Sequence, residues 1–215
     1  MIVLDIESSG LDTGRCGIWQ IGALELENPR NYFLEEGRID DEDICEEGAL
    51  KVIGKTEAEL RDKKKQSQKQ LILNYLNWLT PIKEKLFVGQ NVGWDISFIQ
   101  NKSIRYGIMN KFREVQSQRG IDLHTIAVET YEEMHDTYLL DEKGKSKMNL
   151  ASALEFCGLP DERRLMQGDE IKKQGKSHNA LDDCKLEGEC FSRLMYGKIA
   201  FKEFSKYKVP EVFRK

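Results

Sequence analysis

Asp5 and Glu7 are the first residues along the chain whose type and spacing could do chemistry. They end a short apolar segment, and side chains two positions apart on a strand point to the same face, with Cα atoms about 6.5 Å apart. Two carboxylates held in a partly desolvated place repel each other unless a cation neutralises them, and their hard oxygen atoms suit Mg²⁺ or Mn²⁺. The alternative is a strand end whose acids simply face water, as most charged residues do.

Asp95 supplies a third carboxylate and is expected in the first turn of a helix. It shares a helical stripe with Phe98 and Ile99, so we expect its side chain to point toward the core. The alternative is an acid that caps the helix or interacts with its dipole, a common use of Asp at this position.

His178 precedes the last strong helical pattern, and Asp182 and Asp183 lie in the first turns of that helix. An ordinary histidine pKa of ~6.5 suits a general base that takes a proton from water near neutral pH. The alternative for His178 is a hydrogen-bonded surface residue. Helical periodicity does not separate the two aspartates, because both flank the apolar stripe.

Three motifs, in the same order along the chain, resemble those of the DEDDh exonucleases, a ribonuclease H-like family that includes polymerase proofreading subunits and oligoribonucleases. Residues 5–10, DIESSG, resemble the family's D-x-E-T-T-G. Residues 89–95, GQNVGWD, resemble G-H-N-x-x-F-D, and residues 178–183, HNALDD, resemble H-x-A-x-x-D. The spacing of the third motif selects Asp183 over Asp182.

The resemblance implies an activity and a site. The activity is a metal-dependent 3′–5′ exonuclease that hydrolyses phosphodiester bonds at the 3′ end of single-stranded DNA or RNA and releases 5′-mononucleotides. In the implied two-metal mechanism His178 is the general base. The two divalent cations, Mg²⁺ or Mn²⁺, would be held by Asp5, Glu7, Asp95 and Asp183.

The chain departs from the family motifs at four positions, none of them an acid. Serines replace two threonines, glutamine replaces histidine and tryptophan replaces phenylalanine, at Ser8, Ser9, Gln90 and Trp94. Backbone amides of the glycine turn could approach the terminal sugar, a loop lysine could meet a phosphate, and an aromatic ring could stack on a base. The expected substrate-binding residues are therefore Ser8, Ser9, Gly10, Trp94 and Lys176. Core packing for Trp94 and a solvated loop for Lys176 are the alternatives.

Strands and helices alternate in the order needed to position these residues. Short strands are expected over residues 1–6, 17–27, 32–35 and 86–90. Helices are expected over residues 40–52, around 71–79, from residue 94 onward, after residue 149 and over 179–196, with 160–177 as a mobile loop. This pattern predicts an α/β, ribonuclease H-like fold: a mixed sheet, with an antiparallel meander of about three strands plus parallel strands, flanked by helices.

The bulk properties limit the partners. The 215 residues suit one exonuclease domain over 1–196, with 197–215 as a C-terminal tail or an extra helix of the same domain. The net charge of −4 means that bound cations or a local basic patch must hold a polyanion.

Five cysteines without a CxxC pair favour reduced thiols. We expect a cytoplasmic protein without a membrane partner, because no signal peptide or membrane span is present.

Other functions remain as alternatives at this stage. A proofreading or docking subunit would act through a DNA polymerase, with residues 197–215 as a candidate docking segment. A phosphatase with an aspartyl nucleophile is disfavoured by Glu7, because such enzymes carry a second aspartate there. A binding protein that has lost catalysis is disfavoured because all five matched positions are present. The expected partner is the 3′ end of a single strand, and nothing in the sequence sets an oligomeric state.

Overall fold

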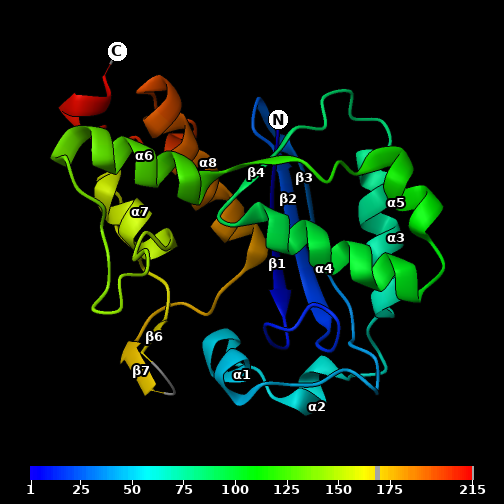
Figure 1. Cartoon of the computed structure of the whole chain (residues 1–215). Helices are drawn as coiled ribbons and strands as arrows, with labels where there is room; N and C mark the ends of the chain where they lie inside the picture. The colour runs from blue at the N-terminus through cyan, green and yellow to red at the C-terminus, as the bar shows by residue number, and fades with distance from the viewer. Residues whose placement is uncertain (168–169, 215) are drawn as a thin grey trace.

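The centre of the computed structural model is a five-stranded mixed sheet (Figure 1). The structure describes residues 1–167 and 170–214. In the strand order β3-β2-β1-β4-β5, the first three strands are antiparallel and β1, β4 and β5 are parallel, which confirms the predicted meander and mixed sheet. The strands are β1 Ile2–Ser8, β2 Ile18–Glu25, β3 Asn28–Glu36, β4 Phe87–Gly89, β5 Gly120–Asp122, β6 Leu165–Gln167 and β7 Glu170–Lys173.

Two groups of helices cover the two faces of this sheet. Helices α3, α4 and α5 pack on one face, and α8, supported by α6 and α7, packs on the other (Figure 1). The helices are α1 Glu47–Ile53, α2 Glu57–Leu60, α3 Gln68–Leu79, α4 Val92–Arg105, α5 Met109–Val115, α6 Leu123–His135, α7 Leu150–Phe156 and α8 Ala180–Tyr196, with the 3₁₀ helices η1 Lys202–Phe204 and η2 Glu211–Phe213.

The alternation of side chains along β1 assigns its acids to one face of the sheet. The opposite face packs into the core shared with α3 and α4, through Ile2, Leu4 and Ile6. Val3 packs against Cys184 of α8. Asp5 and Glu7 follow Val3 at intervals of two residues, so they lie on the side that α8 covers.

The helix predicted over residues 40–52 is wrong in its first half, because α1 begins only at Glu47. The reason is Asp43, which is buried and hydrogen-bonded to side chains of α3 and α4. Those contacts hold residues 40–46 as an irregular segment. The third strand is longer than predicted and contains Pro29, which the sequence suggested as a turn. An edge strand such as β3 tolerates proline.

Part of the predicted loop at residues 160–177 forms a separate two-stranded antiparallel sheet of β6 and β7. Residues 168–169 of that loop lie outside the described residues. Residues 121–130 divide between the end of β5 and helix α6. The difference at residues 160–177 does not change the five-stranded sheet or the elements that carry the predicted acids.

Residues 197–214 pack against the end of α8. Arg193 of that helix is fully buried, pairs with Glu189 at 2.7 Å, and donates to backbone carbonyl oxygens of Cys157 and Tyr207 at 2.9 Å. Apolar residues of the tail are buried over it, namely Phe201, Val209 and Phe213. This part of the chain is therefore attached to the rest by both buried charge and apolar contacts.

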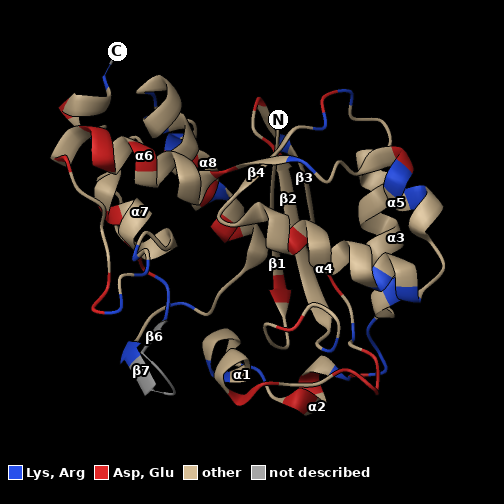
Figure 2. Ribbon diagram, in the orientation of Figure 1, with Lys and Arg blue, Asp and Glu red and all other residues tan. Residues whose placement is uncertain are grey.

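Charged residues are spread over most elements. Figure 2 shows Lys and Arg on several helices and loops, and acidic residues along the segment around α1 and α2 and at the end of β1. All five cysteines are free thiols, as their number and spacing predicted. None of the helices in the described ranges is both long enough and apolar enough to cross a membrane.

Candidate active site

The carboxyl end of β1 holds two acids that are largely withdrawn from water. Asp5 lies opposite Gly22 of β2, and its Oδ2 atom is buried without a hydrogen-bond partner among the described residues. Burial, and then the negative charges of Glu187 and Asp183, raise the pKa of Asp5 well above its usual value. Burial and the charge of Asp183 raise the pKa of Glu7 to about 8. Negative charge therefore predominates around these two acids.

Helix α4 brings Asp95 to the same place. The helix starts after Asn91, whose φ of 57° turns the chain sharply at the end of β4. Asp95 is 4% exposed, and the backbone N–H of Ile6 donates to its Oδ1 atom at 3.1 Å. Burial raises the pKa of Asp95 although this hydrogen bond opposes the change. The bond attaches α4 to β1 between the two acids of the strand.

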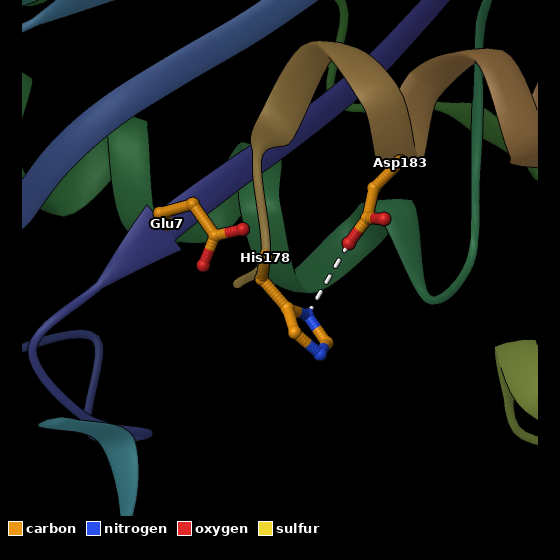
Figure 3. A group of neighbouring side chains, drawn as sticks. All are labelled: Glu7, His178 and Asp183. Atoms are coloured by element: carbon orange, nitrogen blue, oxygen red, sulfur yellow. Dashed lines mark ion pairs between the residues drawn. The ribbon is translucent and has the colours of Figure 1, made fainter. Parts of the chain in front are cut away.

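Helix α8 and the residues before it complete the cluster. Glu7, His178 and Asp183 offer oxygen and nitrogen atoms that all lie within 4.8 Å of one another (Figure 3). His178 Nδ1 lies 3.3 Å from Asp183 Oδ2, and its Nε2 lies 3.0 Å from the carbonyl oxygen of Arg164. Burial alone would lower the pKa of His178, but the hydrogen bond and charge of Asp183 outweigh it and raise the pKa.

Asp183 has a different environment at each of its oxygen atoms. Its Oδ2 also lies 3.3 Å from the guanidinium of Arg163, which in turn pairs with Asp161 at 2.9 Å. Its Oδ1 is buried without a hydrogen-bond partner among the described residues. Oδ2 is thus engaged by other residues of the protein, whereas Oδ1 is available to coordinate a ligand.

Gly22 allows α8 to lie directly on the sheet. A Cβ atom at this position would lie 2.4 Å from the carbonyl carbon of Ala180, far inside van der Waals contact. The side chain of Gln20 accepts a hydrogen bond from the backbone N–H of Ala180 at 2.8 Å, and Cys184 Sγ lies 3.3 Å from the carbonyl oxygen of Gly22. The position of Asp183 therefore depends on the close approach of this helix to β2.

The substitution Gly22→Ala is expected to destabilise the protein and to lower the exonuclease activity that the motif resemblance implies, because the new methyl group displaces the start of α8. Overpacking of this kind costs about 1–3 kcal/mol, which corresponds to a fall in Tm of about 2–12 °C. Chemical denaturation and the exonuclease assay would measure both effects. Gly48→Ala is the control, because a Cβ there has no neighbour within 4 Å. A Gly22→Ala protein as stable as the wild type would contradict this prediction.

Ser8 ends β1, and Ser9 and Gly10 continue into a loop beside the acids. The Ser9 hydroxyl is fully buried, donates to the carbonyl oxygen of Ile44 at 2.6 Å and accepts from the N–H of Gly17 at 2.8 Å. Ser8 donates through its hydroxyl to the carbonyl oxygen of Gly10 at 2.7 Å. The hydrogen bonds of Ser9 thus fix the loop, and substrate contact by the three residues stays a prediction.

An open cleft lies next to the acids and includes Asp5, Gln90, Trp94 and Asp95 in its lining. The half-buried Trp94 donates from Nε1 to the carbonyl oxygen of Leu11 at 3.2 Å. Its ring also packs against the core, with its centroid 5.2 Å from that of Phe98, so core packing holds for part of the side chain and base stacking stays a prediction. Lys176 lies outside this lining, is exposed and pairs with Glu162 at 2.7 Å. Its phosphate contact also stays a prediction.

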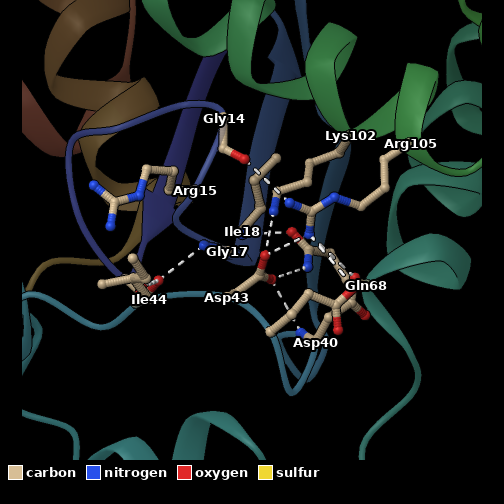
Figure 4. Close-up of polar contacts among 12 residues, drawn as sticks. Gly14, Arg15, Gly17, Ile18, Asp40, Asp43, Ile44, Gln68, Lys102 and Arg105 are labelled. Atoms are coloured by element: carbon tan, nitrogen blue, oxygen red, sulfur yellow. Dashed lines mark hydrogen bonds and ion pairs between the residues drawn. The ribbon is translucent and has the colours of Figure 1, made fainter.

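A buried polar network fastens residues 40–46 to α3 and α4 (Figure 4). The Asp43 side chain is fully buried and lies 2.5 Å from Lys102 Nζ and 2.6 Å from Arg105. Gln68 donates to the same carboxylate at 2.7 Å. Arg105 also donates to the carbonyl oxygen of Gly14 at 3.1 Å. The network therefore links α4, which carries the third acid, to the loop between β1 and β2.

Two residues at the site were not singled out from the sequence. Glu187 lies one helical turn after Asp183 and is 2% exposed. The spacing of four residues on one helix face was a signal that could have found it. Arg163 lies in a segment without periodicity, so no sequence pattern indicated its contact with Asp183.

Comparisons with known proteins agree with this arrangement. The model of the exonuclease family RNase_T matches residues 2–191. No curated protein sequence matches the chain. Among solved structures, an apo exonuclease I superposes with a TM-score of 0.66 at 15% identity, over 99% of this chain and 43% of that one.

Two further solved structures give similar values. Escherichia coli exonuclease I in complex with a dT13 oligonucleotide has a TM-score of 0.64 at 15% identity, over 89% of this chain and 40% of that one. Exonuclease I from Methylocaldum szegediense has a TM-score of 0.65 at 14% identity, over 93% of this chain and 41% of that one. The chain thus spans less than half the length of these enzymes, and the likeness shows the ribonuclease H-like fold predicted from the sequence. Because the family model covers most of its length, the chain belongs to the RNase_T exonuclease family.

Proposed function

We propose that the protein removes mononucleotides one at a time from the 3′ end of single-stranded DNA, in a reaction that needs two divalent cations, Mg²⁺ or Mn²⁺. The observation that carries the proposal is the convergence of acids from three distant segments on one end of the sheet. They come from β1, α4 and α8 and are Asp5, Glu7, Asp95 and Asp183.

The unsatisfied carboxylates fit divalent cations. Asp5 and Asp183 each have one buried oxygen without a hydrogen-bond partner among the described residues, and burial and neighbouring negative charges raise the pKa of Asp5 and Glu7. Carboxylate oxygens are the ligands that Mg²⁺ and Mn²⁺ prefer. When bound, the cations would offset the excess negative charge of the site and would make a water molecule more acidic.

His178 is proposed to take the proton from the attacking water. Nδ1 lies beside a carboxylate and Nε2 beside a carbonyl oxygen, two groups that accept hydrogen bonds, so this arrangement favours the protonated imidazole. One of the two contacts must open before the ring can accept a proton. The residues before α8 form an irregular segment, which allows such a movement. The carboxylate of Asp183 then stabilises the imidazolium that forms.

The choice of single-stranded DNA is supported by the fold relatives. Escherichia coli exonuclease I has been solved with dT13 and dA13 oligonucleotides, and another structure contains exonuclease I with SSB. Trp94 and Leu11 at the cleft here offer apolar surface to an unpaired base. We infer no polymerase partner from these features. The docking role of residues 197–215, like their separation from an exonuclease domain at 1–196, stays a prediction, and the phosphatase alternative has no supporting observation.

A comparison of end-labelled oligonucleotides tests the proposal. With Mg²⁺ or Mn²⁺, a 3′-labelled single strand of DNA should release its label as a 5′-mononucleotide in the first turnover, and a 5′-labelled strand should shorten stepwise. Chelator should stop both reactions, and an RNA strand of the same sequence should be degraded more slowly. Internal cuts, or hydrolysis that persists in chelator, would refute the mechanism. Faster degradation of RNA would refute only the choice of DNA.

A further inference from the structure

Glu187 of α8 is a buried acid whose two oxygen atoms have different environments. Its Oε1 accepts a hydrogen bond at 3.2 Å from the backbone N–H of Gln90, at the end of β4. Its Oε2 is buried and has no hydrogen-bond partner among the described residues. Because Gln90 precedes α4, the first contact ties the helix of Asp183 to the turn that leads into the helix of Asp95.

The free oxygen of Glu187 lies beside Gly89, close to the end of β1 that carries Asp5. A Cβ atom on Gly89 would be 3.3 Å from Oε2 and 2.8 Å from the carbonyl oxygen of Leu4, the residue before Asp5. The glycine thus leaves room for the carboxylate beside the end of β1. Glu187 also interacts electrostatically with Asp5, Asp95 and Asp183, and all of these interactions are repulsive.

A buried carboxylate in this position needs a positive partner. An uncompensated charge away from water costs several kcal/mol. Arg163 acts on Glu187 only at a distance, because its guanidinium is engaged with Asp161 and Asp183. The one hydrogen bond from Gln90 satisfies a single oxygen. A structural role for Glu187 would need only that oxygen, and a neutral glutamine would serve as well.

We propose that Glu187 is a fifth acid of the cation site, with Oε2 as an additional oxygen ligand and its charge as an additional source of cation affinity. This inference rests on the proposed function, since it assumes that the acids on β1, α4 and α8 bind divalent cations. The resembled family motif contains four acids, and Glu187 lies outside it. Glu187 adds an acidic side chain to the site between Asp5 and the end of β4.

The test compares Mn²⁺ binding by the full chain with binding by two variants. Glu187→Gln keeps the shape of the side chain and an oxygen for the N–H of Gln90, and its amide can donate to the neighbouring carboxylates, so the variant should fold. Asp182→Asn removes an exposed acid five residues earlier on the same helix and is the matched control. Isothermal titration calorimetry measures affinity, and thermal unfolding with and without chelator measures the stabilisation by Mn²⁺.

The expected result is a Kd for Mn²⁺ roughly tenfold or more higher in Glu187→Gln, with Asp182→Asn within about twofold of the wild type. The metal-free Glu187→Gln protein should also unfold at a higher temperature than the metal-free wild type, because a repulsive charge is gone. Wild-type affinity in Glu187→Gln, with binding lost in Asp5→Asn, would overturn this inference and leave the proposed function intact. A wild-type protein that binds no Mn²⁺ would overturn both.

Discussion

Asp5→Asn is expected to reduce exonuclease activity by at least about 10²–10³-fold, the usual cost of removing one group that stabilises charge in a transition state. The same change should stabilise the metal-free protein. Asp5 is crowded by four other buried acids, and an amide removes that repulsion without changing the shape of the side chain. A gain of about 1 kcal/mol would raise Tm by about 2–4 °C. Opposite effects on activity and stability distinguish a site residue from a packing residue.

The measurements are the rate of mononucleotide release and the Tm in chelator. Glu133→Gln is a suitable control, because this acid is exposed on α6, away from the site. The control should match the wild type in both measurements. If Asp5→Asn still released mononucleotides at a substantial metal-dependent rate, Asp5 would not be a residue of the active site. A lower Tm for that variant would show that the wild-type carboxylate has a partner that stabilises it.

Asp43→Ala is expected to lower the free energy of unfolding by about 3–5 kcal/mol, because it leaves the buried ammonium of Lys102 unpaired. For a chain of this size the fall in Tm would be about 6–20 °C. Chemical denaturation of the metal-free protein measures the change. Combining Asp43→Ala with Lys102→Met should recover much of the loss, because the second substitution removes the stranded charge. A double variant that loses the sum of the single effects would contradict this explanation.

The same network predicts a dependence on pH. Burial alone would raise the pKa of Asp43, but hydrogen bonds from Lys102 and Gln68 outweigh it and lower the pKa. A carboxyl group with a lowered folded-state pKa contributes stability above its unfolded value of ~3.9, and the contribution is lost as the pH falls through the folded value. The difference in the free energy of unfolding between the wild type and Asp43→Ala should therefore be largest at neutral pH. It should shrink as the pH falls below about 4.

The sequence was most informative where side-chain alternation and motif spacing agreed. The apolar run before Asp5, the glycine turn after Glu7 and the start of a helix near Asp95 predicted three elements that the structure contains. Their order predicted the mixed sheet, and the family membership inferred from the motifs is confirmed. Local patterns sufficed because these elements are short, regular and buried on defined faces.

The sequence failed where long-range contacts override local preference. Acidic residues around Asp43 suggested the start of a helix, but contacts with α3 and α4 hold this segment in an irregular conformation. Arg163 reaches Asp183 across twenty residues from a segment without periodicity. Glu187 had the correct spacing from Asp183, but on a helix so rich in charge an acid is ordinarily exposed. Only packing shows that it is buried.

The acids of the site come from the beginning, the middle and nearly the end of the chain. During translation, β1 leaves the ribosome long before α8 has been made, and α8 covers the face of the sheet on which Asp5 and Glu7 lie. A nascent or truncated polypeptide that lacks this helix therefore has no complete set of ligands. Under the proposed function, a chain whose synthesis has not passed Asp183 is therefore expected to bind the cations incompletely and to lack hydrolytic activity.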